Sequence, residues 1–126
     1  RHTLKQYRGK VVVLHFWASW CQYCRGEIPK LIEMHHGSEQ GVTVLAVSVD
    51  RDLSQLQAFV EQAAHPYVVI PDAHGESSLA RAYDLRGIPV TYLLDPDGRI
   101  AYRFFGSADF LGAVQHLLAR ADASDT

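Results

Sequence analysis

Cysteine is scarce in this chain and long apolar segments are missing, and each absence excludes a class of protein. Only two cysteines occur among the 126 residues, with two residues between them. A small secreted domain held together by disulfides needs more of them. No apolar run approaches the roughly 20 residues of a membrane-spanning helix. The cysteines therefore indicate local chemistry and not a disulfide framework.

An excess of charge of one sign is also missing. The chain carries 12 Lys and Arg against 14 Asp and Glu, without a basic cluster, so we expect no nucleic-acid partner. Its length and its 48% hydrophobic content fit one packed domain over residues 1–126, with a frayed tail at 121–126. Because the sequence opens at Arg1 and not at Met, we expect a fragment, with any signal peptide or anchor lying upstream.

Apolar runs alternate with helical spacings, which predicts a layered α/β domain. The nearly continuous apolar runs are typical of strands buried on both faces of a parallel sheet. Strands are predicted over residues 11–17, 42–49, 67–70, 90–94 and 99–105, and helices from residue 21 to the polar loop at 37–41 and over 53–63, 77–83 and 108–120. The last two strands form a hairpin, which makes the sheet mixed.

Three local features refine these elements. Pro29 lies inside the first predicted helix and should kink it about one turn after the cysteines. On that helix Ile28, Leu31 and Ile32 fall on one face, and His35 is a candidate to extend it. Ser77 is a candidate N-cap for the helix that it begins.

Cys21 and Cys24 occupy the position where a buried strand gives way to a helix. The first turn of a helix presents unpaired N–H groups and the positive end of its dipole, and both favour a thiolate. The two-residue spacing brings the sulfurs within bonding reach. We therefore expect Cys21 to be the exposed nucleophile and Cys24 the more buried resolving thiol of a disulfide-exchange cycle.

Two other interpretations of the pair are weaker. A structural zinc site needs four ligands, and neither a second cysteine pair nor a suitable histidine pair is present. No metal is therefore expected. An inert structural disulfide would close so short a loop that it would stabilise little.

The segments GKVVVLHFWASWCQYCRGEIPKL (9–31) and RGIPVTYLLDPDGRIAYRFFG (86–106) resemble the active-site stretch and the cis-proline loop of thioredoxin-like proteins of the TlpA/ResA group. GVTVLAVSVD (41–50) and PYVVIPD (66–72) resemble the parts that flank the group's central helix-and-strand insert. The resemblance implies a thioredoxin-like fold, with a central mixed sheet flanked by helices and that insert. It also implies that an N-terminal hairpin is truncated here.

Members of this group are bacterial thiol–disulfide oxidoreductases outside the cytoplasm; many are membrane-tethered reductants and several serve cytochrome c maturation. The resemblance thus implies an enzyme in the periplasm or at the cell surface that reduces protein disulfides. It would need no cofactor beyond its own redox-active disulfide, but it would need an upstream thiol electron donor. We expect a monomer, attached to a membrane only through an anchor outside this sequence.

The resemblance also assigns substrate-binding residues. Pro89 matches a proline that is cis in the group and faces the cysteines, and its predecessor Ile88 would expose its backbone to substrate. Trp20 would flank the active site and contact partners. The group commonly has proline where this chain has Tyr23. We expect Tyr23 to be exposed beside the thiols, where it is a candidate contact for a partner protein. The replacement of proline leaves the redox potential and the direction of electron flow open.

Glu27 lies three residues after Cys24, on the same helix face. In ResA-like members a glutamate at this position is implicated in the acid–base behaviour of the thiols, so Glu27 would pass a proton to or from Cys24. A solvated helix glutamate is the alternative, with equal weight.

His15 interrupts the first apolar run, where classical thioredoxins have a buried aspartate. It is either a base or electrostatic tuner of Cys24, or a core histidine bonded to a backbone carbonyl. We expect Trp17 in the core. The remaining histidines are expected on the surface: His2, His35, His36, His65, His74 and His116.

Three other functions compete with a reductase. A disulfide-donating oxidase would have the same fold and a potential near the roughly −120 mV of strong oxidants. A copper chaperone of this fold typically has three residues between its cysteines, and this chain has two. A non-catalytic adaptor would keep the fold without the chemistry.

Overall fold

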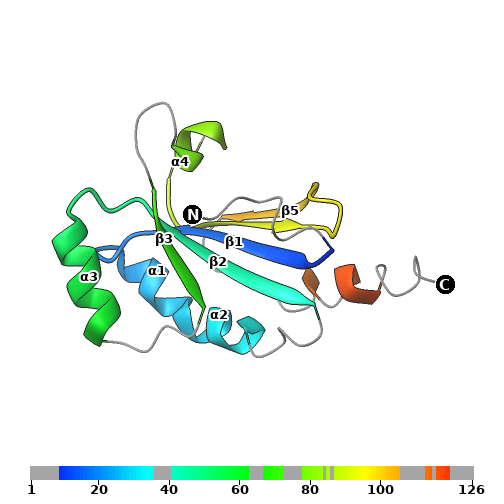
Figure 1. Ribbon diagram of the computed structural model, residues 1–126, viewed down its shortest axis with the longest axis horizontal. Helices are drawn as coiled ribbons and strands as arrows, with labels where there is room; N and C mark the ends of the chain where they lie inside the picture. Colours follow the sequence, from blue (N-terminus) through cyan, green and yellow to red (C-terminus); the bar gives the residue numbers. More distant parts are fainter. Residues whose placement is uncertain are drawn as a thin grey trace.

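A computed structural model describes residues 9–35, 41–62, 67–72, 78–83, 85, 87–105, 113–114 and 116–119. Its centre is a five-stranded sheet in the order β3-β2-β1-β4-β5 (Figure 1). The strands are β1 (Val11–Trp17), β2 (Val42–Ser48), β3 (Val68–Pro71), β4 (Val90–Leu94) and β5 (Ile100–Phe105), and the helices are α1 (Gln22–Gly26), α2 (Ile28–His35), α3 (Leu53–Gln62) and α4 (Leu79–Ala82). Among the described residues, no helix combines the length and apolar character needed to cross a membrane.

Strand β1 is the central element of the sheet. All seven of its residues are buried, as its β-branched and aromatic composition predicts. It pairs in parallel with β2 and antiparallel with β4, and β5 returns along β4 as a hairpin. The predicted mixed sheet is therefore confirmed.

Alternate residues of β1 face two separate cores. Val11, Val13 and Trp17 face the layer that contains α1, α2 and α3, whereas Leu14 and Phe16 face the side covered by α4. Figure 1 shows α1, α2 and α3 on one side of the sheet and α4 on the other. By the same alternation His15 points into the layer that contains both cysteines.

The helix after the cysteines is broken where a kink was predicted. Helix α1 ends at Gly26, and α2 begins at Ile28. Pro29 stands in the first turn of α2, where its missing N–H costs no helical hydrogen bond. Glu27 lies at the junction, and its N–H donates to the Cys24 carbonyl at 3.1 Å.

The face that α2 buries differs partly from the predicted one. Leu31 is buried as expected, but the second buried residue is Met34, while Ile28 and Ile32 are half-buried. The surface prediction for His35 is wrong, because its ring is half-buried and lies 6.5 Å from the ring of Tyr67. His116 is exposed as predicted; the other surface histidines lie outside the described residues.

Most element boundaries differ from prediction by one or two residues. The N-cap of α4 is Ser78 and not Ser77, since the Ser78 hydroxyl accepts from the Arg81 N–H. Strand β3 extends to Pro71, which an edge strand tolerates. Residues 113–114 and 116–119 are helical, with Val114 and Leu117 buried as predicted. The rest of the predicted last helix and the predicted tail at 121–126 lie outside the described residues.

Candidate active site

A disulfide between Cys21 and Cys24 lies at the start of α1, directly after the central strand. Cys21 is the N-cap of the helix, and its Cα atom is 5.2 Å from that of Cys24. The Cys24 N–H donates to the Sγ atom of Cys21 at 3.2 Å. Hydrogen bonding of this kind stabilises negative charge on sulfur.

Access to the two sulfurs is unequal. Cys24 is fully buried, and Cys21 is 7% exposed. Cys24 is the more buried of the two, as predicted. The prediction that Cys21 is exposed is wrong, because Cys21 is itself buried in the oxidised protein. Trp20, which directly precedes Cys21, is 58% exposed, and Tyr23, which directly precedes Cys24, is 83% exposed, as predicted for Tyr23.

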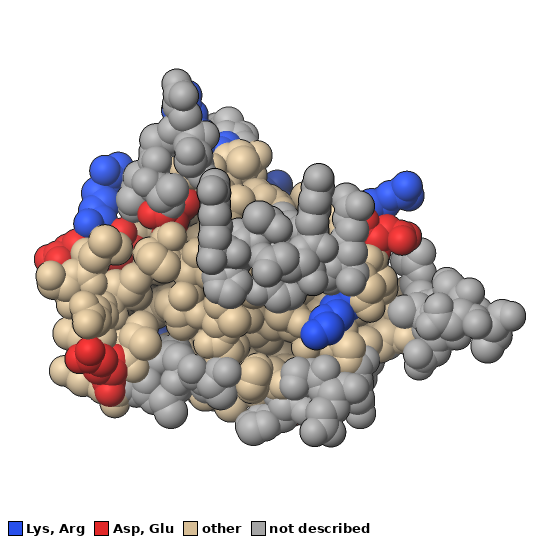
Figure 2. All heavy atoms as spheres, viewed as in Figure 1, with Lys and Arg blue, Asp and Glu red and all other residues tan. Residues whose placement is uncertain are grey.

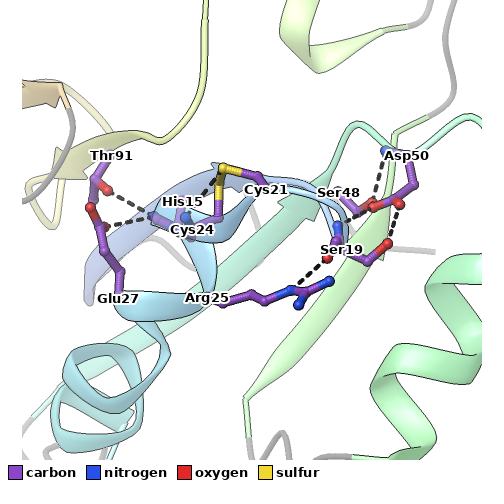
Figure 3. The surroundings of a disulfide bond; sticks show 9 residues. All are labelled: His15, Ser19, Cys21, Cys24, Arg25, Glu27, Ser48, Asp50 and Thr91. Atoms are coloured by element: carbon purple, nitrogen blue, oxygen red, sulfur yellow. Dashed lines mark hydrogen bonds and ion pairs between the residues drawn. A yellow bond between two sulfur atoms is a disulfide. The ribbon is translucent and has the colours of Figure 1, made fainter.

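The turn that leads into Cys21 is fixed by a buried carboxylate (Figure 3). Asp50 follows β2 and accepts hydrogen bonds from the Ser19 N–H at 2.8 Å and from the Ser19 hydroxyl at 2.5 Å. It also accepts from the Ser48 hydroxyl at 2.5 Å. The parallel pairing of β1 with β2 brings these residues to one edge of the sheet.

Arg25 ties the same turn to its surroundings. Its Nε donates to the Ser19 carbonyl at 2.8 Å, and its guanidinium carbon lies 5.1 Å from the centre of the Phe59 ring on α3. The turn before the nucleophile is therefore held from two sides, by a carboxylate and by a guanidinium.

A second polar group, formed by His15, Thr91 and Glu27, is buried between the sheet and the break after α1. His15 Nδ1 is hydrogen-bonded to the Thr91 hydroxyl at 2.8 Å and lies 3.8 Å from Glu27 Oε2. Figure 3 shows Thr91 and Glu27 both directed toward the His15 ring. Thr91 is the cross-strand neighbour of His15 in the pairing of β1 with β4. The bond to a side-chain hydroxyl replaces the backbone carbonyl that we considered for His15.

Burial shifts the pKa values of Glu27 and His15 in opposite directions. It raises the pKa of Glu27 from 4.5 to about 7, against a smaller lowering by the charge of Lys30. It lowers the pKa of His15 from 6.5 to about 3. Because Glu27 is only 2% exposed, it is not the solvated helix glutamate of the alternative interpretation. Within the described part of the chain, neither of its carboxyl oxygens has a hydrogen-bond partner.

The other predicted site residues lie around the disulfide in two groups. The Ile88–Pro89 peptide bond is cis, with Pro89 buried and Ile88 half-buried. Trp20 and Ile88 line one hollow, whereas Tyr23 and Glu27 line another of about 350 Å³. Across the residues that the structure describes, no group of three or more His, Cys, Asp or Glu side chains is arranged to hold a metal ion.

The fold and the cysteine pair define a thioredoxin-like protein, and comparison with known proteins supports this class. A model of the AhpC/TSA family matches residues 1–103, and the chain belongs to that family.

Relatives agree with this assignment. The chain is 32% identical to the thiol-disulfide oxidoreductase ResA of Geobacillus thermodenitrificans over 92% of its own length and 66% of that protein's, so it spans just under two thirds of the relative. A candidate thiol:disulfide interchange protein DsbE of Chlorobium tepidum superposes with a TM-score of 0.80 at 29% identity, covering 94% of this chain and 84% of that one. The thioredoxin domain of a Bacteroides vulgatus thiol-disulfide oxidoreductase gives 0.82 at 25% identity, with 91% and 84% covered.

Sequence reasoning missed the residues that support the site. Asp50, Ser19 and Ser48 were not singled out, although the carboxyl ends of adjacent parallel strands meet at one edge, where polar residues gather. That rule would have found Asp50. Thr91 has no comparable pattern, since it lies 76 residues after His15 and their contact depends on the register between β1 and β4.

Removing the Asp50 carboxylate should destabilise the turn before Cys21. Asp50→Ala leaves two buried hydroxyls and the Ser19 N–H without their acceptor, and we expect a loss of about 2–4 kcal/mol in the free energy of unfolding. Urea unfolding of the oxidised protein measures it. Asp97→Ala, an exposed aspartate in the β4–β5 turn, is the control and should change stability by less than about 0.5 kcal/mol. Equal effects would contradict the assigned role.

The raised pKa of Glu27 should make stability fall as pH rises. Between pH 4.5 and about 7 the unfolded chain loses this proton while the folded chain keeps it, so the free energy of unfolding decreases through that window. Glu27→Gln removes the effect, and its stability relative to the parent should be about 2–3 kcal/mol higher near pH 8 than near pH 4.5. Urea unfolding at both pH values measures this.

Glu33→Gln, on the exposed side of α2, is the matched control. His15 remains in both variants and acts oppositely: its lowered pKa gives stability that is lost as pH falls from about 6.5 toward 3. The difference in the free energy of unfolding between Glu27→Gln and the parent therefore reports the contribution of Glu27 alone. Parallel curves for the two proteins would show that the carboxyl is not held neutral by burial.

Proposed function

We propose that this protein is a thiol–disulfide oxidoreductase that reduces disulfides of other proteins outside the cytoplasm. The observation that carries the proposal is the Cys21–Cys24 disulfide at the start of α1, with the Cys24 N–H directed at the Cys21 sulfur. The names of the relatives support the chemistry. The cellular setting and the direction of electron flow rest on the resemblance to the TlpA/ResA group. Several members of that group serve cytochrome c maturation, which is one candidate role for this protein.

The reaction consists of two exchanges. In the dithiol form, the Cys21 thiolate attacks one sulfur of the substrate disulfide, and the other substrate sulfur leaves as a thiolate. Cys24 then loses its proton and attacks the Cys21 sulfur, which releases the second substrate thiolate. The substrate gains two electrons and two protons, and the protein is left with its internal disulfide. A thiol donor must reduce that disulfide before the next cycle.

Glu27 is the base for the second exchange in this proposal. Cys24 is buried, so its thiol cannot hand a proton directly to bulk water. Glu27 lies one helical turn further along, and its pKa of about 7 is suited to accepting a proton at neutral pH. The adjacent hollow lined by Gln22, Tyr23 and Gly26 then provides the route by which Glu27 exchanges that proton with solvent.

His15 acts through Glu27 as a positioning residue. Its lowered pKa keeps it neutral at physiological pH, so it contributes no positive charge to the carboxyl group. Thr91 fixes the ring by a hydrogen bond at Nδ1, the same atom that approaches Glu27. We expect a change in this ring to shift the pH at which Glu27 titrates, because the ring lies against the carboxyl group and contributes to its burial.

Cysteine variants should separate the two exchanges. Cys24→Ser should accumulate a mixed disulfide between Cys21 and its substrate, because the resolving thiol is absent. Non-reducing electrophoresis and mass spectrometry of extracts detect the adduct. Cys21→Ser is the control and should trap nothing, and both variants should lose insulin-disulfide reduction. Trapping by Cys21→Ser instead would reverse the roles of the two cysteines.

Redox equilibration with glutathione tests the direction of electron flow. A potential well below the roughly −120 mV of strong oxidants supports the reductase. A value near −120 mV would favour the oxidase of the same fold.

The pH dependence of the second exchange should reveal Glu27. Stopped-flow reaction of the dithiol protein with an aromatic disulfide resolves the attack by Cys21 from the release by Cys24. The rate of release should rise through an inflection near pH 7. Glu27→Gln should remove the inflection and slow release roughly 100-fold, the usual contribution of a general base. An unchanged profile would exclude Glu27 from the reaction.

His15→Asn provides a test of position in the same assay. It should move the inflection in the parent background and leave the profile of Glu27→Gln unchanged, because it acts only through the carboxyl group. Thr91→Val, which removes the hydroxyl bonded to His15 Nδ1, should move the inflection in a similar way. Effects that add in the double variants would assign His15 an independent role.

A further inference from the structure

The backbone of Ser19, two residues before Cys21, is hydrogen-bonded on both sides by charged side chains from different elements (Figure 3). Its N–H donates to Oδ1 of Asp50 at 2.8 Å, and its carbonyl accepts from Nε of Arg25 at 2.8 Å. Because peptide groups are planar, holding the N–H and the carbonyl of one residue restricts both of its backbone torsion angles. We call this arrangement of Asp50, Ser19 and Arg25 the Ser19 clamp.

Each arm of the Ser19 clamp is itself anchored. Asp50 is 1% exposed; its Oδ1 accepts from the Ser48 hydroxyl at 2.5 Å, and its N–H donates to the same hydroxyl oxygen at 3.0 Å. The guanidinium of Arg25 lies over the ring of Phe59, which is a cation–π contact. The carboxylate is therefore fixed to the end of β2, and the guanidinium is fixed to α3.

The Ser19 clamp acts on the turn that ends at Cys21. The Cys21 N–H donates to the Ala18 carbonyl at 3.1 Å, which closes a four-residue β-turn with Ser19 and Trp20 at its centre. Directly after this turn the Cys21 sulfur accepts from the Cys24 N–H. The torsion angles of Ser19 therefore determine whether the sulfur stays within reach of that N–H.

The charge of the molecule as a whole gives the Cys21 sulfur no special environment. The chain has a net charge of −2, and the charged side chains on the face in Figure 2 lie scattered without a broad field of one sign. The Ser19 clamp places one negative and one positive side chain on a single residue, so their direct electrostatic effects on a thiolate at Cys21 oppose each other. Their effect on the backbone, in contrast, is shared.

We propose that Asp50 and Arg25 are positioning residues for the nucleophile. Acting together through Ser19, they hold the Cys21 sulfur at the Cys24 N–H and so keep its thiolate reactive. This inference rests on the proposed function, in which Cys21 makes the first attack. It gives the first exchange a pair of supporting residues of its own, whereas Glu27 serves the second exchange.

Alkylation of the dithiol protein by iodoacetamide tests the proposal without any disulfide exchange. The reagent reacts with thiolates, and mass spectrometry identifies the alkylated cysteine. Asp50→Asn gives up charge-assisted hydrogen bonds, and Arg25→Gln removes the other arm of the clamp. Each should slow alkylation of Cys21 about 3- to 10-fold in the rising part of its pH profile, the usual effect of weakening one hydrogen bond. Both profiles should also lie at higher pH than that of the parent.

The direction of the two effects distinguishes the Ser19 clamp from direct electrostatics. Loss of a negative charge near a thiolate favours it, and loss of a positive charge disfavours it. Charge alone would therefore speed alkylation in Asp50→Asn and slow it in Arg25→Gln, whereas the clamp slows both. The other titratable side chains drawn around the disulfide in Figure 3, His15, Cys24 and Glu27, are unchanged in both variants. Alkylation of Asp50→Asn as fast as the parent, or faster, overturns the proposal.

Two further arginine variants are controls for charge. Arg25→Lys keeps the charge but loses the planar fork and its stacking, so it should slow alkylation nearly as much as Arg25→Gln. Arg51→Gln removes the same charge from the exposed arginine that follows Asp50 and should leave the rate within about 2-fold of the parent. A parent-like rate in Arg25→Lys, or an equal loss in Arg51→Gln, assigns the effect to charge and overturns the proposal.

The double variant Asp50→Asn/Arg25→Gln tests whether the two arms act as a unit. It should be slowed about as much as the slower single variant, because both arms act through one residue. Effects that multiply would make the two side chains independent and overturn the clamp. Thermal melting checks that each variant folds; because Arg25 is exposed, its variants test the proposal even where Asp50→Asn does not fold. If alkylation follows these expectations but the parent exchanges no disulfides, only the proposed function fails.

Discussion

The hydrogen bond from the Cys24 N–H to the Cys21 sulfur is the interaction on which the chemistry of this molecule depends. It exists because the chain passes directly from the central strand into a helix, so that Cys21 becomes the N-cap. That passage is fixed on one side by the burial of all of β1 and on the other by Asp50, which holds the intervening turn. The sulfur chemistry is thus set by backbone geometry, and the backbone geometry by packing.

Two polar side chains, Glu27 and His15, are buried next to this interaction, and their burial lowers the stability of the fold. A carboxyl group without hydrogen-bond partners in an apolar layer destabilises a fold, and Glu27 avoids the larger cost of a buried charge by remaining protonated up to about pH 7. His15 avoids it by remaining neutral. Groups whose environments push their pKa values apart are typical of acid–base sites. In the proposed cycle this cost has a function, because Glu27 follows Cys24 by one helical turn and exchanges a proton with its thiol.

Local patterns in the sequence were sufficient for the parts of the site that are close together in the chain. The buried first strand, the cysteine pair, the break near Pro29 and the exposure of Tyr23 all follow from short-range spacing and residue type. The pairing of His15 with Thr91 does not, because it depends on the antiparallel register of β1 and β4. Burial of Glu27 was undecidable from spacing, since it depends on how the break between α1 and α2 packs against the sheet.

The two hollows beside the disulfide have different functions in the proposed cycle. Trp20 and Ile88 line one hollow, on the side where the resemblance places the substrate, whereas Tyr23 and Glu27 line the other, where Cys24 would exchange its proton. A bound substrate can then cover Cys21 without closing the proton route to Glu27. Tyr23, which replaces the proline common in the resembling group, stands on the second side and is 83% exposed. Substitution of Tyr23 should therefore change the rate of the second exchange more than substrate affinity, because Tyr23 lines the hollow that contains Glu27 and not the hollow that contains Trp20 and Ile88.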